Sequence, residues 1–220
     1  MARPQRFLVN VILTNGFAVT AYCANPGSFE TRIKRGCPVL LWASPDLRRK
    51  RLHTWRAVKQ ARTWIGTDTH LANLLVEKSV AENRIPSLRG YVMEKREPRG
   101  IQGRRLDLLL RKKGRRCFVE VKSAMVAVGA VAQFPDSRSE RACAHLAEMT
   151  ALAARGERAV VVFLAQRGDV QALRINRKRD RGFADAYDLA RKSGVEAIAL
   201  KHSVSRCGFG PPIVIPILEA

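Results

Sequence analysis

Two short apolar runs in the middle of the chain, separated by a basic segment with a central glycine, constrain the fold more than any other feature. Residues 106–110 and 117–121 are rich in branched and aromatic side chains, whereas residues 111–116 are mostly Lys and Arg. Apolar runs on either side of a polar, glycine-containing segment are typical of a β-hairpin. The centre of this chain is therefore predicted to be a strand, a loop and a second strand.

Three ionisable residues interrupt this hairpin: Asp107, Glu120 and Lys122. Side chains alternate along a strand, so Glu120 and Lys122 should project from one face, with Asp107 beside them on the neighbouring strand. A charge so deep in an apolar run is costly unless it is satisfied, and a divalent metal ion would satisfy the two carboxylates. We therefore interpret Asp107 and Glu120 as candidate ligands of Mg²⁺ or Mn²⁺, and all three residues as candidate catalytic groups.

An acid followed, on the next strand, by Glu-x-Lys is the active-site pattern of the restriction-endonuclease-like nucleases, written PD-(D/E)xK. An edge hairpin with one solvated face would show Asp, Glu and Lys at the same alternate positions. The pattern alone does not choose between the two, because short motifs need structural context.

The charge of the chain favours a polyanionic partner. Forty Lys and Arg face 19 Asp and Glu, which leaves a net charge of +21 in 220 residues. Such an excess destabilises the compact state by self-repulsion, but it suits a protein that binds phosphates and releases their counterions. Nucleic acid, DNA or RNA, is the expected partner. A membrane surface is the weaker alternative, because no long basic amphipathic helix is present.

The cysteines and the N-terminus bear on the cellular compartment. The five cysteines are odd in number and widely spaced, without a Cys-x-x-Cys pair, which indicates neither a disulfide framework nor a zinc site. Residues 1–7 lack the apolar stretch of a signal peptide, and no run approaches the length of a membrane span. We expect a cytoplasmic protein.

The front of the chain is predicted to be a small β-barrel. Short apolar runs separated by turn residues predict strands at residues 7–13, 17–22, 38–43, 54–59 and 63–65, with a tight turn at Asn15-Gly16. Five short strands favour an OB-like barrel, a common nucleic-acid-binding fold. Residues 1–66 carry 12 Lys and Arg but only 2 acids, so this domain is the more densely basic part.

One basic run in this barrel is a candidate nucleic-acid contact. It lies in a predicted loop between two tryptophans, Trp42 and Trp55, and consists of Arg48, Arg49, Lys50 and Arg51. A basic loop near aromatic rings suits contact with the phosphate backbone together with base stacking. Alternatively, the tryptophans belong to the barrel core and the basic run is only solvated.

Residues 67–220 are predicted to form a second domain of the α/β (α+β) class, which contains both helices and strands. The predicted elements are a helix over 69–85, a three-strand meander from 91 to 122, a loop over 124–132, a helix from Ser137 to Ala154, and then strand 158–166, helix 180–192 and strand 195–200. This order is the one that a restriction-endonuclease-like mixed sheet with flanking helices requires.

Each of the first two helices of this domain carries candidate site residues. On the first, Leu71, Leu74, Leu75 and Ala81 are predicted to form the apolar stripe, and Glu77 falls beside it. On the second, Arg141 and His145 share a face, from which they are candidate contacts to a nucleic-acid phosphate.

Many landmarks, in one order, resemble the sugar fermentation stimulation protein (SfsA) family over nearly the whole chain. They include Arg6-Phe7-Leu8, Cys23 with Asn25, His53-Thr54-Trp55, Asn73-x-Leu75 with Glu77, Arg105-x-Asp107, Glu120-Val121-Lys122-Ser123, Phe134-Pro135-Asp136, and Arg141 with His145. The chain departs from the family pattern at residues 124–126, 142, 144 and around Cys23. The resemblance implies an OB-like domain, a nuclease-like domain, non-specific DNA binding and a link to sugar-metabolism genes.

The resemblance also assigns residues. It places Asp107, Glu120 and Lys122 at the nuclease positions and Glu77 at the helix acid that some of these cores add, while the backbone carbonyl of Val121 completes the expected metal site. Two functions follow: a metal-dependent phosphodiesterase acting on DNA or RNA, or a non-catalytic, non-specific DNA-binding protein with a regulatory role. The absence of a helix-turn-helix pattern argues against sequence-specific repression.

Overall fold

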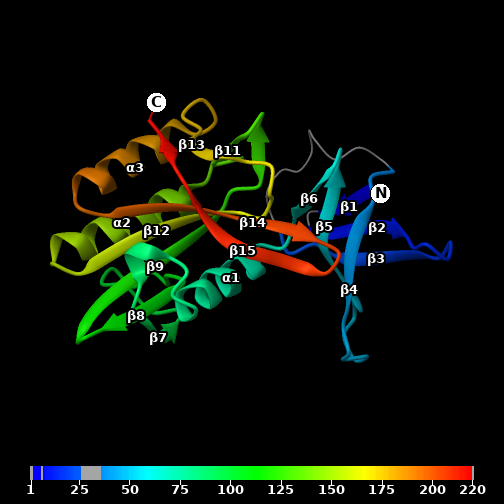
Figure 1. Cartoon of the computed structure of the whole chain (residues 1–220), viewed down its shortest axis with the longest axis horizontal. Coiled ribbons are helices and arrows are strands. Elements are labelled where there is room, and N and C mark those ends of the chain that lie inside the picture. Colours follow the sequence, from blue (N-terminus) through cyan, green and yellow to red (C-terminus); the bar gives the residue numbers. More distant parts are fainter. Residues whose placement is uncertain (1, 6, 26–35, 220) are drawn as a thin grey trace.

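The computed structural model describes residues 2–5, 7–25 and 36–219. In this part of the chain a β-sheet domain stands beside a larger domain of mixed sheet and helices (Figure 1). The predicted α+β class, with a β-rich first domain, is confirmed.

The first domain is a six-stranded sheet in the order β1-β2-β3-β5-β4, with β6 paired to β5. Its strands are β1 (Ala2–Gln5), β2 (Leu8–Ile12), β3 (Ala18–Tyr22), β4 (Val39–Ala43), β5 (His53–Gln60) and β6 (Thr63–Gly66). The last five correspond to the predicted strands, whereas β1 was not predicted. Alternation along β2 buries Val9 and Val11 against the fully buried Trp55. At the turn between β2 and β3, Gly16 has a φ of +86°, where a side chain would be strained.

The second domain has a six-stranded main sheet in the order β15-β14-β12-β9-β8-β7. Its strands are β7 (Val92–Arg96), β8 (Leu108–Lys112), β9 (Arg115–Ser123), β12 (Arg158–Ala165), β14 (Glu196–Ser205) and β15 (Gly208–Ile215). Strand β12 runs parallel to both β9 and β14, whereas β7, β8 and β9 form the predicted antiparallel meander. The hairpin between β8 and β9 turns at Lys113 and Gly114, both with positive φ, as two-residue hairpins require.

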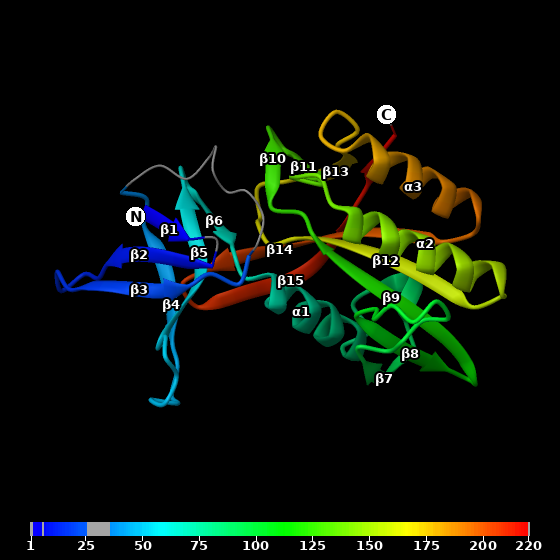
Figure 2. The same cartoon turned by 180° about the vertical axis from the view of Figure 1, so that it is seen from behind.

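Three helices cover the two faces of this sheet: α1 (Thr69–Ala81), α2 (Glu140–Ala154) and α3 (Arg181–Lys192) (Figure 2). Alternate residues of β8 and β9 face opposite helices. Leu108 and Val119 pack in the cluster that contains α1, whereas Leu109 and Phe118 pack in the cluster that contains α2 and α3. This alternation places Glu120 and Lys122, which share the parity of Phe118, on the α2 face.

A second, four-stranded sheet corrects one prediction. Residues 124–132 were predicted to be a loop, but they contain a hairpin of β10 (Val126–Val128) and β11 (Val131–Phe134). This hairpin is completed by β13 (Ala172–Ile175) and β16 (Ile217–Leu218), in the order β10-β11-β13-β16. Its small residues Ala127 and Ala132 are buried in the core. Strand β11 forms because it pairs with β13, about 40 residues further along the chain. Local propensity does not show such a distant pairing.

Two helix predictions also need correction. Helix α1 ends at Ala81, and its buried face is formed by Ala72, Val76, Ser79 and Val80 rather than by the predicted leucine stripe. Leu74 is 48% exposed. The cap of α2 is Ser139, not Ser137, because the Ser139 hydroxyl accepts the Ala142 N–H at 3.1 Å. The short 3₁₀ segment η1 (Pro86–Leu88) follows α1.

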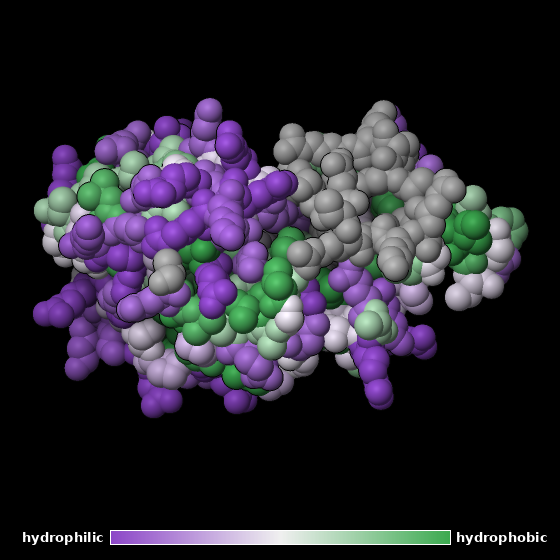
Figure 3. Space-filling view, turned by 90° about the horizontal axis from the view of Figure 1, so that it is seen from above, coloured by the Kyte–Doolittle hydropathy of each residue, from purple (hydrophilic) through white to green (hydrophobic). Residues whose placement is uncertain are grey.

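The two domains are tied together by hydrogen bonds. Gly66 N–H donates to the Gln166 carbonyl at 2.7 Å, and the Thr69 hydroxyl donates to the Ala24 carbonyl at 2.6 Å. Met125 packs in the core of the first domain. Seen from above, the surface of the second domain is mostly hydrophilic (Figure 3). Among the residues described, no helix is both long and apolar enough to cross a membrane.

Candidate nuclease-like site

The predicted acid on the hairpin lies at the point where β8 begins. Asp107 immediately precedes β8, opposite the part of β9 that β8 no longer pairs. Its carboxylate replaces the missing strand: Oδ2 accepts the Val121 N–H at 2.7 Å. Its backbone carbonyl accepts the Glu97 N–H at 2.9 Å. Asp107 is therefore held by both its main chain and its side chain against the centre of β9.

Glu120 and Lys122 lie in β9 and face the same side, as predicted. Both are buried, and Lys122 Nζ donates to Glu120 Oε1 at 2.7 Å. His145 of α2 is also buried, and its Nδ1 contacts the same Oε1 atom while lying 3.5 Å from Lys122 Nζ. The other oxygen, Glu120 Oε2, is buried without a hydrogen-bond partner among the described residues. One side of this carboxylate is thus fully engaged and the other is unsatisfied.

The pKa values of the two acids move in opposite directions. Burial, followed by the negative charge of Glu120, raises the pKa of Asp107 from 3.8 to about 6. Burial also acts to raise the pKa of Glu120, but the charge of Lys122 and the contact with His145 outweigh it, so the net pKa is lowered. Asp107 forms no ion pair among the described residues, and the charge of Lys122 offsets its burial only in part, so it is the carboxylate that a cation would stabilise most.

Helix α1 adds a residue that the sequence argument did not assign. Asn73 Nδ2 donates to Asp107 Oδ1 at 2.7 Å, so the Asp107 side chain is held from both the helix and β9. Glu77, the predicted helix acid, lies one turn further along α1 and forms two hydrogen bonds of 2.8 Å with Arg96. Its role as a metal ligand stays a prediction. The signal for Asn73 in the sequence was its i, i+4 spacing from Glu77, which places both on one helix face.

The residues present fit a hard divalent cation. Asp107 and Glu120 supply carboxylate oxygens, and one of these oxygens is buried without a partner. The part of the chain that the structure describes contains no cluster of three or more His, Cys, Asp or Glu side chains suited to a metal. Two carboxylates are what Mg²⁺ commonly uses, because it retains several waters and takes further oxygens from a phosphate.

A pocket of about 290 Å³ opens beside these residues, between the domains. Lys122 and Asn73 line it, as do Ser123 at the end of β9 and Asn25 from the first domain. The segment 134–139, which leads into α2, forms another wall. The Ser123 hydroxyl is buried and has no hydrogen-bond partner among the described residues. The pocket therefore gives a polar ligand access to Lys122.

The two predicted α2 contacts lie in different environments. His145 is buried against Glu120 and Lys122, so it is part of the charged cluster rather than of the surface. Arg141 is exposed in the first turn of α2. Contact of either residue with a nucleic-acid phosphate stays a prediction.

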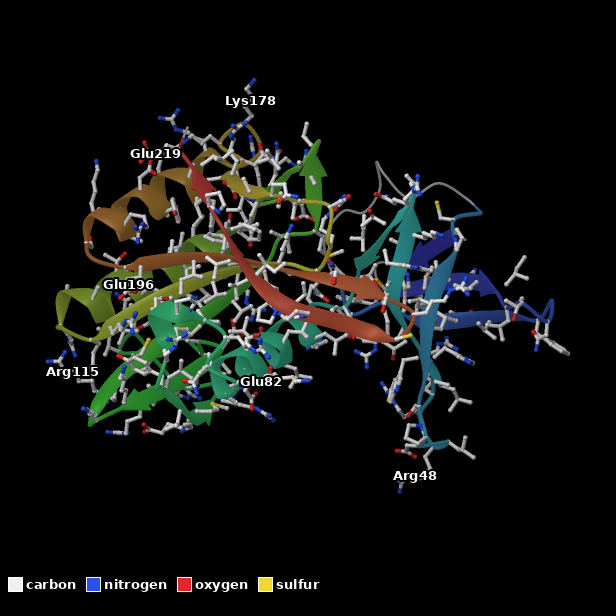
Figure 4. All side chains as sticks on the ribbon, viewed as in Figure 1. Arg48, Glu82, Arg115, Lys178, Glu196 and Glu219 are labelled. Atoms are coloured by element: carbon white, nitrogen blue, oxygen red, sulfur yellow. The ribbon has the colours of Figure 1, made fainter. Side chains whose placement is uncertain are left out.

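The basic run 48–51 lies in a loop of the first domain, in which Arg48, Arg49 and Lys50 are exposed and Arg51 is half-buried, and Arg48 lies at the end of this loop (Figure 4). Arg48 Nε donates to Asp46 at 2.9 Å, a solvent-exposed ion pair. The two tryptophans differ in exposure, because Trp55 is fully buried in the core and Trp42 is 39% exposed. The guanidinium groups of Arg49 and Arg56 lie 5.9 and 5.1 Å from the Trp42 ring centroid. Trp42 is thus a partly exposed ring with two guanidinium groups beside it, of which that of Arg56 is also paired with Asp68.

Comparison with known proteins covers both domains. The family model described as SfsA N-terminal OB domain matches residues 1–67, and the one described as sugar fermentation stimulation protein RE domain matches residues 70–208. The sugar fermentation stimulation protein homolog of Thioalkalivibrio sulfidiphilus is 39% identical over 201 residues, which are 90% of this chain and 85% of that protein. The homolog of Rhodospirillum centenum is 38% identical over 210 residues, which are 94% and 90% of the two chains.

A solved structure is similar over the same length. SfsA of Pyrococcus furiosus, in complex with Ca²⁺, superposes with a TM-score of 0.90. The two chains are 27% identical, and the match covers 99% of this chain and 93% of the other.

Proposed function

Because this chain belongs to the sugar fermentation stimulation protein (SfsA) family, we propose that it is a nucleic-acid-binding protein with a metal-dependent phosphodiesterase site. Its substrate would be DNA or RNA, and it would act in the cytoplasm. The observation that carries this proposal is the pair of carboxylates in the site. Asp107 has a raised pKa that the charge of Lys122 offsets only in part, and Glu120 Oε2 is buried without a hydrogen-bond partner among the described residues.

Asp107, Glu120 and the backbone carbonyl of Val121 would hold Mg²⁺ or Mn²⁺. The Ca²⁺ in the Pyrococcus furiosus relative supports a hard-cation site in this fold. When bound, such an ion polarises the phosphate and lowers the pKa of an attacking water. Glu77 would serve a second ion only if it left Arg96, with which it is now paired.

The other side chains of the site have distinct tasks. Lys122 lines the pocket, and its ammonium group would orient the attacking water or stabilise the charge that develops on the phosphate. His145 contacts Glu120 Oε1, which leaves Oε2 as the oxygen without a hydrogen-bond partner among the described residues. Asn73 fixes Asp107 from the helix side. The protein thus holds both carboxylates in place before substrate arrives, which is the preorganisation that electrostatic catalysis needs.

Nucleic-acid binding would rest mainly on the basic surface rather than on the site. The largely exposed run 48–51 offers phosphate contact, and the ring of Trp42, with Arg49 and Arg56 beside it, offers base stacking. Arg141 and His145 are further proposed contacts near the pocket. Binding of this kind has little sequence preference and depends strongly on salt.

One observation favours the alternative, a non-catalytic DNA-binding protein with a regulatory role in sugar metabolism. Glu120, Lys122 and His145 satisfy one another through Glu120 Oε1, which accepts from Lys122 Nζ at 2.7 Å and contacts His145 Nδ1. A charge cluster that served only to stabilise the fold would show the same contacts at Glu120 Oε1.

Cleavage of fluorescent DNA and RNA with Mn²⁺, with Mg²⁺ and with EDTA separates the two functions. The proposal predicts metal-dependent cleavage that is lost in Asp107→Asn, Glu120→Gln and Lys122→Ala, while each variant still binds the nucleic acid. A folded wild type that binds both probes but cleaves neither with either metal would leave the regulatory alternative.

A further inference from the structure

The segment between β7 and β8, residues 97–107, ends at Asp107, and its residues 98–106 have no role in the site as described so far. It is an irregular hairpin rather than an open loop, and we call it the 97–107 hairpin. Leu106 N–H donates to the Pro98 carbonyl at 2.9 Å, Arg99 bridges Arg105, and Gly100 N–H donates to the Arg104 carbonyl at 2.7 Å. Its backbone is therefore held by hydrogen bonds along most of its length.

The tip of this hairpin is fixed by a buried acid on α2. Glu148 is 0% exposed, and its two carboxylate oxygens accept the backbone N–H groups of Gln102 at 2.9 Å and Arg104 at 3.3 Å. Gly100 passes so close that an added Cβ atom would lie 2.4 Å from Glu148 Oε1. Burying a carboxylate is costly unless its oxygens are hydrogen-bonded. The buried carboxylate of Glu148 thus holds the backbone of the exposed tip of the hairpin in place.

The segment held in this shape is strongly basic. Arg99, Arg104 and Arg105 are all exposed, and in the described part of the chain neither Arg99 nor Arg104 is paired with an acid. Beside the hairpin lies a groove of about 470 Å³, lined by five cations, Lys95, Arg96, Arg99, Arg105 and Arg116, and by one acid, Glu97. Arg105 is paired with Glu97 at 3.3 Å, but both side chains are mostly exposed, so this pair is worth little.

The groove opens on the α2 face of the sheet, the face from which Glu120 and Lys122 of the candidate site project. Its floor is formed by Leu109, two residues after Asp107, and by Phe118, two residues before Glu120. Two residues along a strand span about 7 Å, so the groove begins within one such step of the carboxylates. Glu120 and Lys122 share this face with the groove, and Asp107, which Asn73 of α1 holds from the other side, is the last residue of the hairpin itself. A strand bound in the site would therefore pass over the hairpin's arginines.

We propose that the 97–107 hairpin binds the phosphate backbone of the nucleic acid next to the site, and that Glu148 is a positioning residue that holds the hairpin in its binding shape. This inference rests on the proposed function, since it names the surface by which that site takes its polyanion. It concerns binding alone, so it can be tested without any cleavage.

The test measures affinity for short fluorescent single-stranded and duplex DNA by anisotropy, in EDTA, between about 50 and 200 mM potassium chloride. The variants are Arg99→Ala/Arg104→Ala and Glu148→Gln. The matched control for the first is Lys113→Ala/Arg115→Ala, which removes two exposed cations from the β8–β9 turn, where Figure 4 labels Arg115 at the far end of the second domain. The matched control for the second is Glu140→Gln, an exposed acid on the same helix as Glu148.

The arginine variant should raise Kd about tenfold and reduce the slope of log affinity against log salt by about 1 to 2, and the control should do neither. Glu148→Gln removes a negative charge, which by charge alone strengthens DNA binding. It nevertheless replaces an acceptor of the hairpin with an amide donor, so we expect Kd to rise severalfold, while Glu140→Gln leaves it equal or lower. Hydrogen exchange should show faster exchange of the Gln102 and Arg104 amides in Glu148→Gln, with an unchanged global fold.

Equal losses in the two double variants would show that affinity follows net charge and would overturn the proposal. Glu148→Gln binding as tightly as Glu140→Gln would do the same. If Glu148→Gln does not fold, Gly100→Ala provides the second perturbation, because its methyl group displaces the hairpin from Glu148; wild-type affinity in a folded Gly100→Ala would then refute the positioning role. If the wild type binds neither probe, the proposed function itself is wrong. If these variants cleave normally and bind as tightly as the wild type, only the role of the hairpin is wrong.

Discussion

Asp107→Asn should stabilise the protein in the absence of metal. Burial and the charge of Glu120 raise the pKa of Asp107 from 3.8 to about 6, which means that ionised Asp107 opposes folding. A shift of about two units corresponds to about 3 kcal/mol of free energy of unfolding. The amide keeps the geometry, because its oxygen can accept the Val121 N–H and Asn73 can turn its own oxygen to the new NH₂ group.

The pH dependence has a definite sign. Since the folded chain binds the Asp107 proton more tightly than the unfolded chain, the contribution of this group to stability is fully present below about pH 4 and is lost as pH rises through about 6. The advantage of Asp107→Asn should therefore be about 3 kcal/mol at pH 8 and about half of that at pH 5.

Urea unfolding in EDTA, followed by circular dichroism, measures this difference at both pH values. Wild type and variant must be compared at each pH, because burial lowers the pKa of His202, which changes stability in the same range with the opposite sign. Mn²⁺ should reduce this difference at pH 8, since the wild type binds the ion more tightly and gains more binding energy than the variant. A variant that is less stable than wild type in EDTA at pH 8, or a difference that is the same at pH 5 and 8, would refute this reasoning.

Two further predictions concern the first domain. Replacing Arg48, Arg49, Lys50 and Arg51 by Ala together should weaken DNA binding and flatten its salt dependence, because exposed charges contact phosphates; an unchanged slope in the same anisotropy titration would move the contact surface elsewhere. Trp42→Ala should weaken binding of single-stranded DNA by about 1 kcal/mol or more and of duplex DNA by less, because only unpaired bases can stack on the exposed ring. Equal losses for the two probes would assign Trp42 to packing alone.

The sequence predicted what depends on local patterns. Alternation and turn residues located the strands of the first domain from β2 to β6, and the same alternation brought Glu120 and Lys122 to one face. Asp107 could be placed beside them because an antiparallel hairpin fixes which residues are opposite.

What it missed depends on contacts distant in sequence. Strand β11 forms because it pairs with β13, which lies about 40 residues further along the chain. The face of α1 that is buried depends on how the helix packs against the sheet, and the leucines of the helix do not determine it. The spacing of Asn73 from Glu77 shows a shared helix face but not the contact with Asp107, and nothing local marks Glu148, because both roles arise only when the helices pack against distant segments. The exposure of Trp42 and the burial of Trp55 follow from which side of the sheet each faces.

Binding of Mn²⁺ to the folded protein, measured by electron paramagnetic resonance as loss of the free-ion signal, tests the central claim most directly. The account predicts that the wild type binds Mn²⁺ and that Asp107→Asn and Glu120→Gln each lose at least about tenfold in affinity, because each removes an anionic ligand. Lys122→Ala should bind Mn²⁺ at least as well as wild type, because its ammonium group lies outside the proposed ligand set. A wild type that binds no Mn²⁺, or carboxylate variants that bind it as the wild type does, would contradict the account.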